Sequence, residues 1–287
     1  DNPYFPKVLE KEMLYDKKHD HNKYLQKWLG QPMGIGGRIY PRFERKIHVR
    51  DFEKDILRKQ GNHFMSIDPH SKYYPAIIFG VIFPKNERKR WPEDFHKHIY
   101  AEFPTVKDMD GPYHELRHKV RYEGTLSQMA TNIYAREGHG EGIKILARYI
   151  DTRYAKGAGG RTMTTMGLVE EWAKEEHGSI RLEMPPEKMI DIQREMIQED
   201  LMFNKHAPIS EFNEPTLTIS PSCPNLIHSL ENHCLQEDSE KEDEEYKDFS
   251  DALRILYAGL TDFSYKTPSE DGESNSYQFP TGGGWMG

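Results

Sequence analysis

Apolar residues along this chain predict three consecutive strands in its first half. Residues 63–69 (HFMSIDP) are a short apolar run that ends in Asp68 and Pro69. Residues 76–83 (AIIFGVIF) are almost entirely apolar, and residues 97–103 (KHIYAEF) follow after a charged segment. Short apolar and aromatic runs separated by turn residues are typical of strands, and three in succession predict an antiparallel meander.

In the second half of the chain, segments with apolar residues at helical spacing alternate with short apolar runs typical of strands. Residues 125–138 place Leu126, Met129 and Ile133 at helical spacing, and Gly138 can end that helix. The pattern further predicts strands at 143–151 and 180–184, helices at 164–178, 186–203, 223–236 and 248–260, and short extended pieces at 38–50 and 215–220. The predicted order of the main elements is β-β-β-α-β-α-β, which indicates an α/β fold.

Composition adds that the chain can form one hydrophobic core. Hydrophobic residues make up 36% of the 287 residues and charged residues 30%. No apolar run approaches the roughly 20 residues that a membrane helix needs, so we expect no membrane association. The two cysteines, Cys223 and Cys234, are too few for a disulfide framework and are expected to be reduced thiols.

The net charge of −8 is distributed unevenly, and its distribution leaves room for a polyanionic partner. Residues 237–251 hold nine acids and two lysines, whereas residues 144–161 hold five basic residues and one acid. Local fields can attract nucleic acid even when the total charge is acidic. Solvated surface charge is the alternative explanation. The candidate DNA contacts after the strand 143–151 and at the turn 84–97 are Arg153, Lys156, Arg161, Lys85, Arg88, Lys89 and Arg90.

Four aspartates stand where chemistry could be assembled. Asp68 and Asp151 each end an apolar strand, and Asp248 and Asp251 lie one helical turn apart at the start of the last helix. Carboxylates at the margins of the core can form an oxygen-rich site for Mg²⁺ or Mn²⁺. Taken singly, each has a structural alternative, since an Asp before Pro starts turns and an acid in the first helical turn complements the helix dipole.

The strand order and the acids together resemble the RNase H-like nucleases, and the sequence is similar to the nuclease domain of phage large terminase subunits. The similar segments are GRIYPRFERKIHV (37–49), SIDPHSKYYPAIIFGVI (66–82), PTLTISPSCPNLIHSLENH (215–233) and KDFSDALRILYAG (247–259). Residues 105–123 depart from the pattern as an insertion. KGAGGRT (156–162) is glycine-rich but is not a nucleotide-binding P-loop, and no such motif occurs in the chain.

The resemblance implies a central mixed five-stranded sheet flanked by helices. It also implies two Mg²⁺ or Mn²⁺ ions as cofactors, with Asp68, Asp151, Asp248 and Asp251 as catalytic metal ligands. The implied activity is cleavage of double-stranded DNA during viral genome packaging in the host cell cytoplasm. The implied partners are double-stranded DNA, the terminase small subunit and the portal protein, and the ATPase domain that precedes the nuclease in the family is not contained in this chain.

The domain organisation expected from these segments has three parts. Residues 1–50 are a linker or extension, residues 51–267 the nuclease domain, and residues 268–287 a flexible C-terminal tail. Two other functions stay open: another RNase H-like DNA nuclease such as a junction resolvase, and a non-catalytic docking module of the packaging motor whose acids are structural. A zinc site among the histidines is disfavoured, because their spacing matches no closed zinc site, and Glu102 is left out of the candidate set.

Overall fold

The computed structural model describes most of the predicted domain. The described residues are 37–53, 57, 61–70, 73–85, 95–117, 119–120, 126–137, 143–151, 182–185, 190–210, 213–235, 242–260, 264–266 and 276–278, with residues 9, 11, 13 and 28 further towards the N-terminus. Within these residues, no helix has the length and apolar character needed to cross a membrane.

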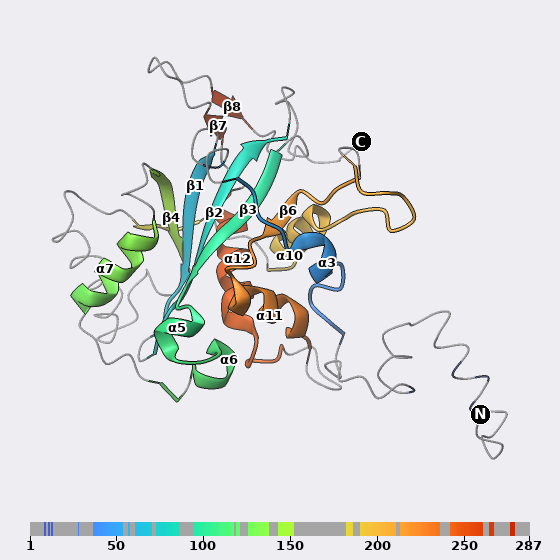
Figure 1. Ribbon diagram of the computed structural model, residues 1–287, viewed down its shortest axis with the longest axis horizontal. Helices are drawn as coiled ribbons and strands as arrows, with labels where there is room; N and C mark the ends of the chain where they lie inside the picture. Colours follow the sequence, from blue (N-terminus) through green and yellow to red (C-terminus); the bar gives the residue numbers. More distant parts are fainter. Residues whose placement is uncertain are drawn as a thin grey trace.

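A six-stranded mixed sheet forms the centre of the molecule (Figure 1). Its strands, in the order in which they lie side by side, are β5 (Leu182–Glu183), β4 (Ile145–Ile150), β1 (Asn62–Asp68), β2 (Ala76–Pro84), β3 (Phe95–Phe103) and β6 (Leu217–Ile219). The pairs β1/β2 and β2/β3 are antiparallel, while β1/β4, β4/β5 and β3/β6 are parallel. The meander predicted from the apolar runs is therefore confirmed, with β1 at the centre of the sheet.

The sheet has one strand more than the sequence predicted. Leu217–Ile219 was expected to be a short extended piece, but it pairs in parallel with β3, so the expected five-stranded sheet is wrong in its strand count. Three residues with no alternating pattern carry little signal of their own, and the pairing depends on a partner more than 100 residues away. The first five strands nonetheless occur in the predicted order, the first three as the predicted antiparallel meander, and the RNase H-like α/β fold is confirmed.

The helices agree with the predicted ones where the structure describes them. They are α3 (Arg45–His48), α5 (Val106–Met109), α6 (Tyr113–Leu116), α7 (Leu126–Arg136), α10 (Ile190–Asp200), α11 (Pro224–Asn232) and α12 (Lys247–Leu260). The turn α3 was not predicted, because residues 38–50 were expected to be extended. Residues 105–123 contain α5 and α6, and the helix predicted at 164–178 lies outside the described residues.

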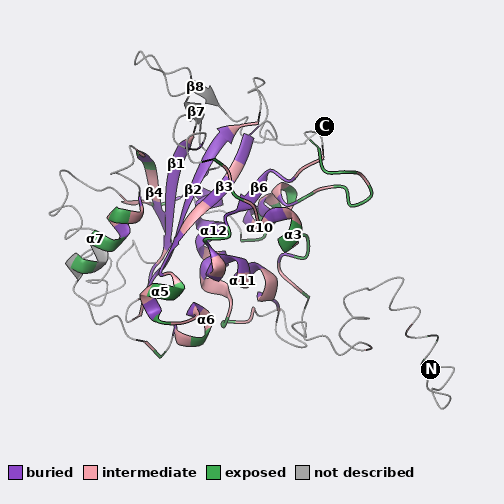
Figure 2. Cartoon of the chain, in the orientation of Figure 1, coloured by how far each residue is buried: buried purple, intermediate pink, exposed green. Residues whose placement is uncertain are grey.

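Alternation along β1 divides the core into two layers. Phe64 contacts the larger apolar cluster, which includes residues of α10, α11 and α12, whereas Met65 and Ile67 contact a second cluster with Ile133 of α7. Helix α12 is buried along almost its whole length (Figure 2). A helix buried on all sides needs apolar residues around its circumference, and the run from Ala252 to Leu260 supplies them.

Both ends of the predicted domain pack differently from a loose linker and tail. Tyr40 and Phe43 are each 1% exposed within the main core, so the expected extension of residues 1–50 packs on the domain from residue 37 onward. In the expected C-terminal tail, β8 (Ser276–Gln278) pairs with β7 (Ser264–Lys266). The boundaries proposed at residues 50 and 267 stay predictions.

Candidate active site

Parallel pairing of β1 and β4 places two aspartates at one end of the sheet. Ile67 pairs with Ile150, and the next residue on each strand is an acid, Asp68 or Asp151. The carboxyl ends of neighbouring parallel strands lie at the same edge. The two residues are therefore adjacent although they lie far apart in the sequence.

Helix α12 brings the other two aspartates to the same edge. It packs across β1, β2 and β4. The hydroxyl of Ser66 in β1 donates a hydrogen bond of 2.7 Å to the carbonyl oxygen of Ala252. Because Ser66 precedes Asp68 by two positions and Ala252 follows Asp251 directly, this bond fixes the first turns of α12 beside the end of β1.

The other three aspartates lie near enough to Asp68 to act on its ionisation. The pKa of Asp68 is raised well above its ordinary value, first by burial and then by the charges of Asp251, Asp248 and Asp151, in that order. Burial and like charges both disfavour an ionised carboxylate. Of the two acids on α12, Asp251 has the larger effect on the pKa of Asp68. The sequence-predicted acids are thus brought together, while their catalytic roles stay predictions.

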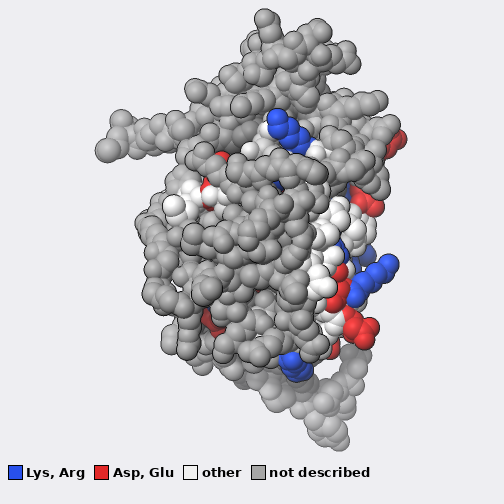
Figure 3. Space-filling view, turned by 90° about the vertical axis from the view of Figure 1, so that its left-hand side faces the viewer, with Lys and Arg blue, Asp and Glu red and all other residues white. Residues whose placement is uncertain are grey.

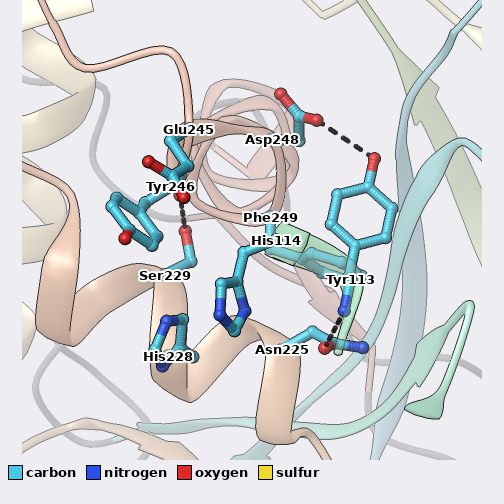
Figure 4. Close-up of a pocket in the computed structure, with 9 residues that line it drawn as sticks. All are labelled: Tyr113, His114, Asn225, His228, Ser229, Glu245, Tyr246, Asp248 and Phe249. Atoms are coloured by element: carbon cyan, nitrogen blue, oxygen red, sulfur yellow. Dashed lines mark hydrogen bonds between the residues drawn. The ribbon is translucent and has the colours of Figure 1, made fainter. Parts of the chain in front are cut away.

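Each acid of α12 is paired with an arginine. The Asp248 Oδ2 atom lies 3.0 Å from Arg117 and accepts a hydrogen bond of 3.0 Å from the Tyr113 hydroxyl (Figure 4). The Asp251 Oδ1 atom accepts a bond of 3.1 Å from Arg254, whose guanidinium also donates to Gln193 at 2.9 Å. Burial raises the pKa of Asp248, and Arg117 and Tyr113 oppose that rise.

The chemistry of this cluster fits a hard divalent cation, although the described side chains are not arranged as a finished metal site. Carboxylate oxygens are the ligands that Mg²⁺ and Mn²⁺ prefer. Four carboxylates at one sheet edge concentrate negative charge that a cation would neutralise. Within the described residues, no three Asp, Glu, His or Cys side chains stand together in a geometry that could hold an ion.

Sequence reasoning missed two residues that contact the acid cluster, Tyr113 and Arg117. They lie in and directly after α6, within the segment 105–123 that the sequence indicated to be an insertion. Their role depends on a contact with α12 more than 130 residues away. Nothing in the local pattern around Arg117 distinguishes it from a solvated surface charge, so the sequence held no signal that could have identified it.

Glu102 is a structural acid rather than a fifth member of the cluster. It is 1% exposed, and its two carboxylate oxygens accept the backbone N–H groups of Asn225 and Leu226, each at 2.9 Å. Burial raises the pKa of Glu102 to about 8, against the opposing effect of these hydrogen bonds. Both oxygens are used to satisfy the first turn of α11, where helical N–H groups have no partners within the helix.

The basic residues proposed to contact DNA are mostly untested. Arg153, Lys156, Arg161, Arg88, Lys89 and Arg90 lie outside the described residues. The described Lys and Arg side chains on the face shown in Figure 3 are scattered among acidic ones. Those six residues therefore stay predictions.

Of the basic residues proposed at the turn after β2, the structure describes Lys85, which follows the strand end opposite the one beside Asp68. Asp68 pairs with Ala76 at the start of β2, while Lys85 follows the other end of that strand. At about 3.3 Å per residue, the nine residues of β2 separate these ends by roughly 30 Å. Lys85 instead lies 3.9 Å from Glu214.

The order β5-β4-β1-β2-β3, with an acid at the end of β1 and of β4 and acids on a late helix, decides the fold. The domain is RNase H-like. Comparison with family models and with curated proteins finds no match to this sequence. Comparison with solved structures finds phage terminases, the family that the sequence resembles.

One match is the large terminase of a thermophilic bacteriophage, with a TM-score of 0.49, 12% sequence identity, and coverage of 90% of this chain and 53% of that one. Another is the nuclease domain of the P22 large terminase, with a TM-score of 0.49, 14% identity, and coverage of 78% of this chain and 93% of that one. The chain spans about half the length of the thermophilic phage terminase. At these values the assignment of the fold rests on the strand order rather than on the matches.

Proposed function

We propose that this RNase H-like domain is a metal-dependent endonuclease that cuts double-stranded DNA, as the nuclease part of a phage large terminase. The observation that carries the proposal is the convergence of four aspartates from β1, β4 and α12 on one sheet edge. The neighbouring acids raise the pKa of Asp68, and holding these charges together lowers the free energy of unfolding. Such a cost is typical of functional sites.

The chain's own residues would supply the ligands and their orientation. Asp68, Asp151 and Asp251 would hold the cations, with Asp248 beside them. Bound in pairs, such cations activate water and stabilise the leaving oxygen in phosphodiester cleavage. Strand ends hold the first two carboxylates rigidly, and the buried helix α12 holds the others. The expected cofactors are two Mg²⁺ or Mn²⁺ ions.

The proposed setting is genome packaging in the host cell cytoplasm. The partners would be double-stranded DNA, the terminase small subunit, the portal protein and an ATPase domain supplied outside this chain. Phosphate contacts from Arg153, Lys156 and Arg161, which follow Asp151 in sequence, would hold the duplex without reading bases. Replacing Arg153 and Lys156 by Gln should weaken binding to all duplexes alike and flatten its salt dependence by nearly one unit per lost contact.

Cleavage of supercoiled plasmid tests the activity. The purified chain should nick or linearise DNA in Mg²⁺ or Mn²⁺ and leave it intact in EDTA. Asp68→Ala and Asp151→Ala should each abolish cleavage. Asp191→Asn is the matched control, because its side chain on α10 is 78% exposed and lies outside the cluster. Undiminished cleavage in EDTA, or in either alanine variant, would overturn the proposal.

The same assay separates the two alternatives. A junction resolvase should cut a four-way junction much faster than a linear duplex of the same sequence, whereas a terminase-type nuclease should show little preference. A docking module with structural acids should cut nothing with either metal and should tolerate Asp68→Asn without loss of any function.

A further inference from the structure

The ion pair between Arg117 and Asp248 joins the segment 105–123 to the acid cluster. Arg117 is 5% exposed, and the Asp248 side chain is 12% exposed. Two donors from this one segment, the Arg117 guanidinium and the Tyr113 hydroxyl, reach the same oxygen, Asp248 Oδ2, at 3.0 Å each. An ion pair and a hydrogen bond on the same oxygen restrict the position of a carboxylate more than either contact alone.

The donors are themselves held in a fixed frame. The backbone N–H of Tyr113 donates to Asn225 Oδ1 at 3.2 Å, and its hydroxyl also lies 3.2 Å from the carbonyl oxygen of Tyr74. Arg117 donates to the carbonyl oxygen of Glu245 at 3.0 Å, just before α12 begins. Figure 4 shows Tyr113 extending from α6 towards Asp248. The segment is thus anchored to α11, to the loop before α12 and to the residues after β1.

The charges around Asp248 indicate that the contacts of Arg117 and Tyr113 do more than pack two segments together. Asp248 faces Asp68 and Asp251, which are like charges, and Arg254 is already paired with Asp251. Arg117 is therefore the cation that offsets Asp248 most strongly. Without this partner, the Asp248 carboxylate could rotate away from its acidic neighbours, because only the Tyr113 hydroxyl would then contact its Oδ2 atom.

We propose that Arg117, assisted by Tyr113, is a positioning residue that holds the Asp248 carboxylate in its orientation within the acid cluster, which makes α6 and the residue after it part of the active site. The proposal rests on the proposed nuclease function, because its catalytic consequence requires that function. The proposal also has a structural consequence: the contribution of Arg117 to thermal stability should depend on divalent cations. This dependence can be measured without any cleavage.

The experiment measures thermal unfolding of the full chain in EDTA and in Mn²⁺. Arg117→Gln should lower the Tm in EDTA more than in Mn²⁺, because added cations replace part of the lost charge. The Mn²⁺-induced rise in Tm should therefore exceed that of the unchanged chain. Arg136→Gln is the matched control, since Arg136 pairs with Asp108 of the same segment at 2.7 Å, and it should lower the Tm equally in both conditions.

Cleavage rates complete the test. Arg117→Gln should reduce kcat by about 10- to 100-fold, as for residues that orient metal ligands, with a smaller change in KM for DNA. Arg117→Lys should restore part of the rate because it keeps the charge. If Arg117→Gln does not fold, Tyr113→Phe, which removes one of the two donors, should show both effects in weaker form.

The outcomes distinguish the two proposals. If Mn²⁺ stabilises the unchanged chain but Arg117→Gln, like Arg136→Gln, lowers the Tm equally in EDTA and in Mn²⁺, the positioning role is overturned. The nuclease proposal then still stands. A chain that Mn²⁺ stabilises but that cuts no DNA would overturn the nuclease proposal, while the Tm comparison still decides the role of Arg117. A chain that Mn²⁺ does not stabilise would overturn both.

Discussion

The Ser66 hydroxyl in β1 donates a buried hydrogen bond of 2.7 Å to the carbonyl oxygen of Ala252 in α12. This bond connects the central strand to the acidic helix within two residues of Asp68 and one residue of Asp251. The separation of the acids from these two elements therefore depends on a polar contact as well as on apolar packing. A single hydroxyl can thus affect the geometry of the cluster.

Ser66→Ala should lower both stability and activity. Loss of one intramolecular hydrogen bond should reduce the free energy of unfolding by about 1 kcal/mol, and α12 would be held by packing alone. We expect cleavage to fall more than this loss of folded protein can explain. Urea unfolding and kcat measure the two effects. Ser222→Ala, which removes a 2.9 Å bond to Tyr100 from an exposed serine, is the control, and an unchanged kcat in Ser66→Ala would contradict the prediction.

Asp68→Asn should stabilise the metal-free chain while removing its response to metal. The pKa of Asp68 is raised well above its usual value by burial and by Asp251, Asp248 and Asp151, so its charge opposes folding at neutral pH. A gain of about 1 kcal/mol raises the Tm of a domain of this size by roughly 2–4 °C. Calorimetry in EDTA and in Mn²⁺ measures this. A lower Tm in EDTA for the variant would show that the cluster is not repulsive.

Glu102→Ala should destabilise the domain at the start of α11. It leaves the buried N–H groups of Asn225 and Leu226 without acceptors, and each costs about 1–3 kcal/mol. Glu102→Gln should recover only part of the loss, because an amide has one acceptor oxygen where the carboxylate has two. Urea unfolding is the measurement, and a loss below about 1 kcal/mol for the alanine variant would contradict the assigned cap.

Acid should destabilise the domain below about pH 6.5, the ordinary pKa of histidine. Burial lowers the pKa of both His63 and His98 to about 4, so these rings are neutral when folded. Between pH 6.5 and 4 the unfolded chain binds more protons than the folded one, so stability falls as the pH falls, by up to about 1.4 kcal/mol per unit for each ring.

The Tm measured from about pH 7.5 to about pH 4.5 tests this dependence. His63→Gln should flatten the decrease, because it removes one of the two groups. Glu214 and Glu242, whose pKa values are lowered to about 2 by hydrogen-bonded partners, add their own loss only below their ordinary pKa of 4.5. A slope between about pH 6.5 and 5 that His63→Gln leaves unchanged would assign the transition to other groups.

The sequence by itself determined the identity of the main elements and the ends of the strands. Apolar runs and helical spacing are local properties, and they located β1 to β4 and the helices α7, α10, α11 and α12 to within a few residues. An acid directly after an apolar run must lie at the margin of the core. For this reason Asp68 and Asp151 could be selected before any contact between them was known.

Only the tertiary structure decided which segments meet. The addition of β6 to the sheet, the position of Lys85 roughly 30 Å from Asp68, and the pairing of Arg117 with Asp248 all depend on which segments pair in the folded chain. A charged residue has the same local pattern whether it is solvated or buried against a partner. Burial and partner are properties of the packed chain, and they alone reveal the ion pair of Arg117 with Asp248.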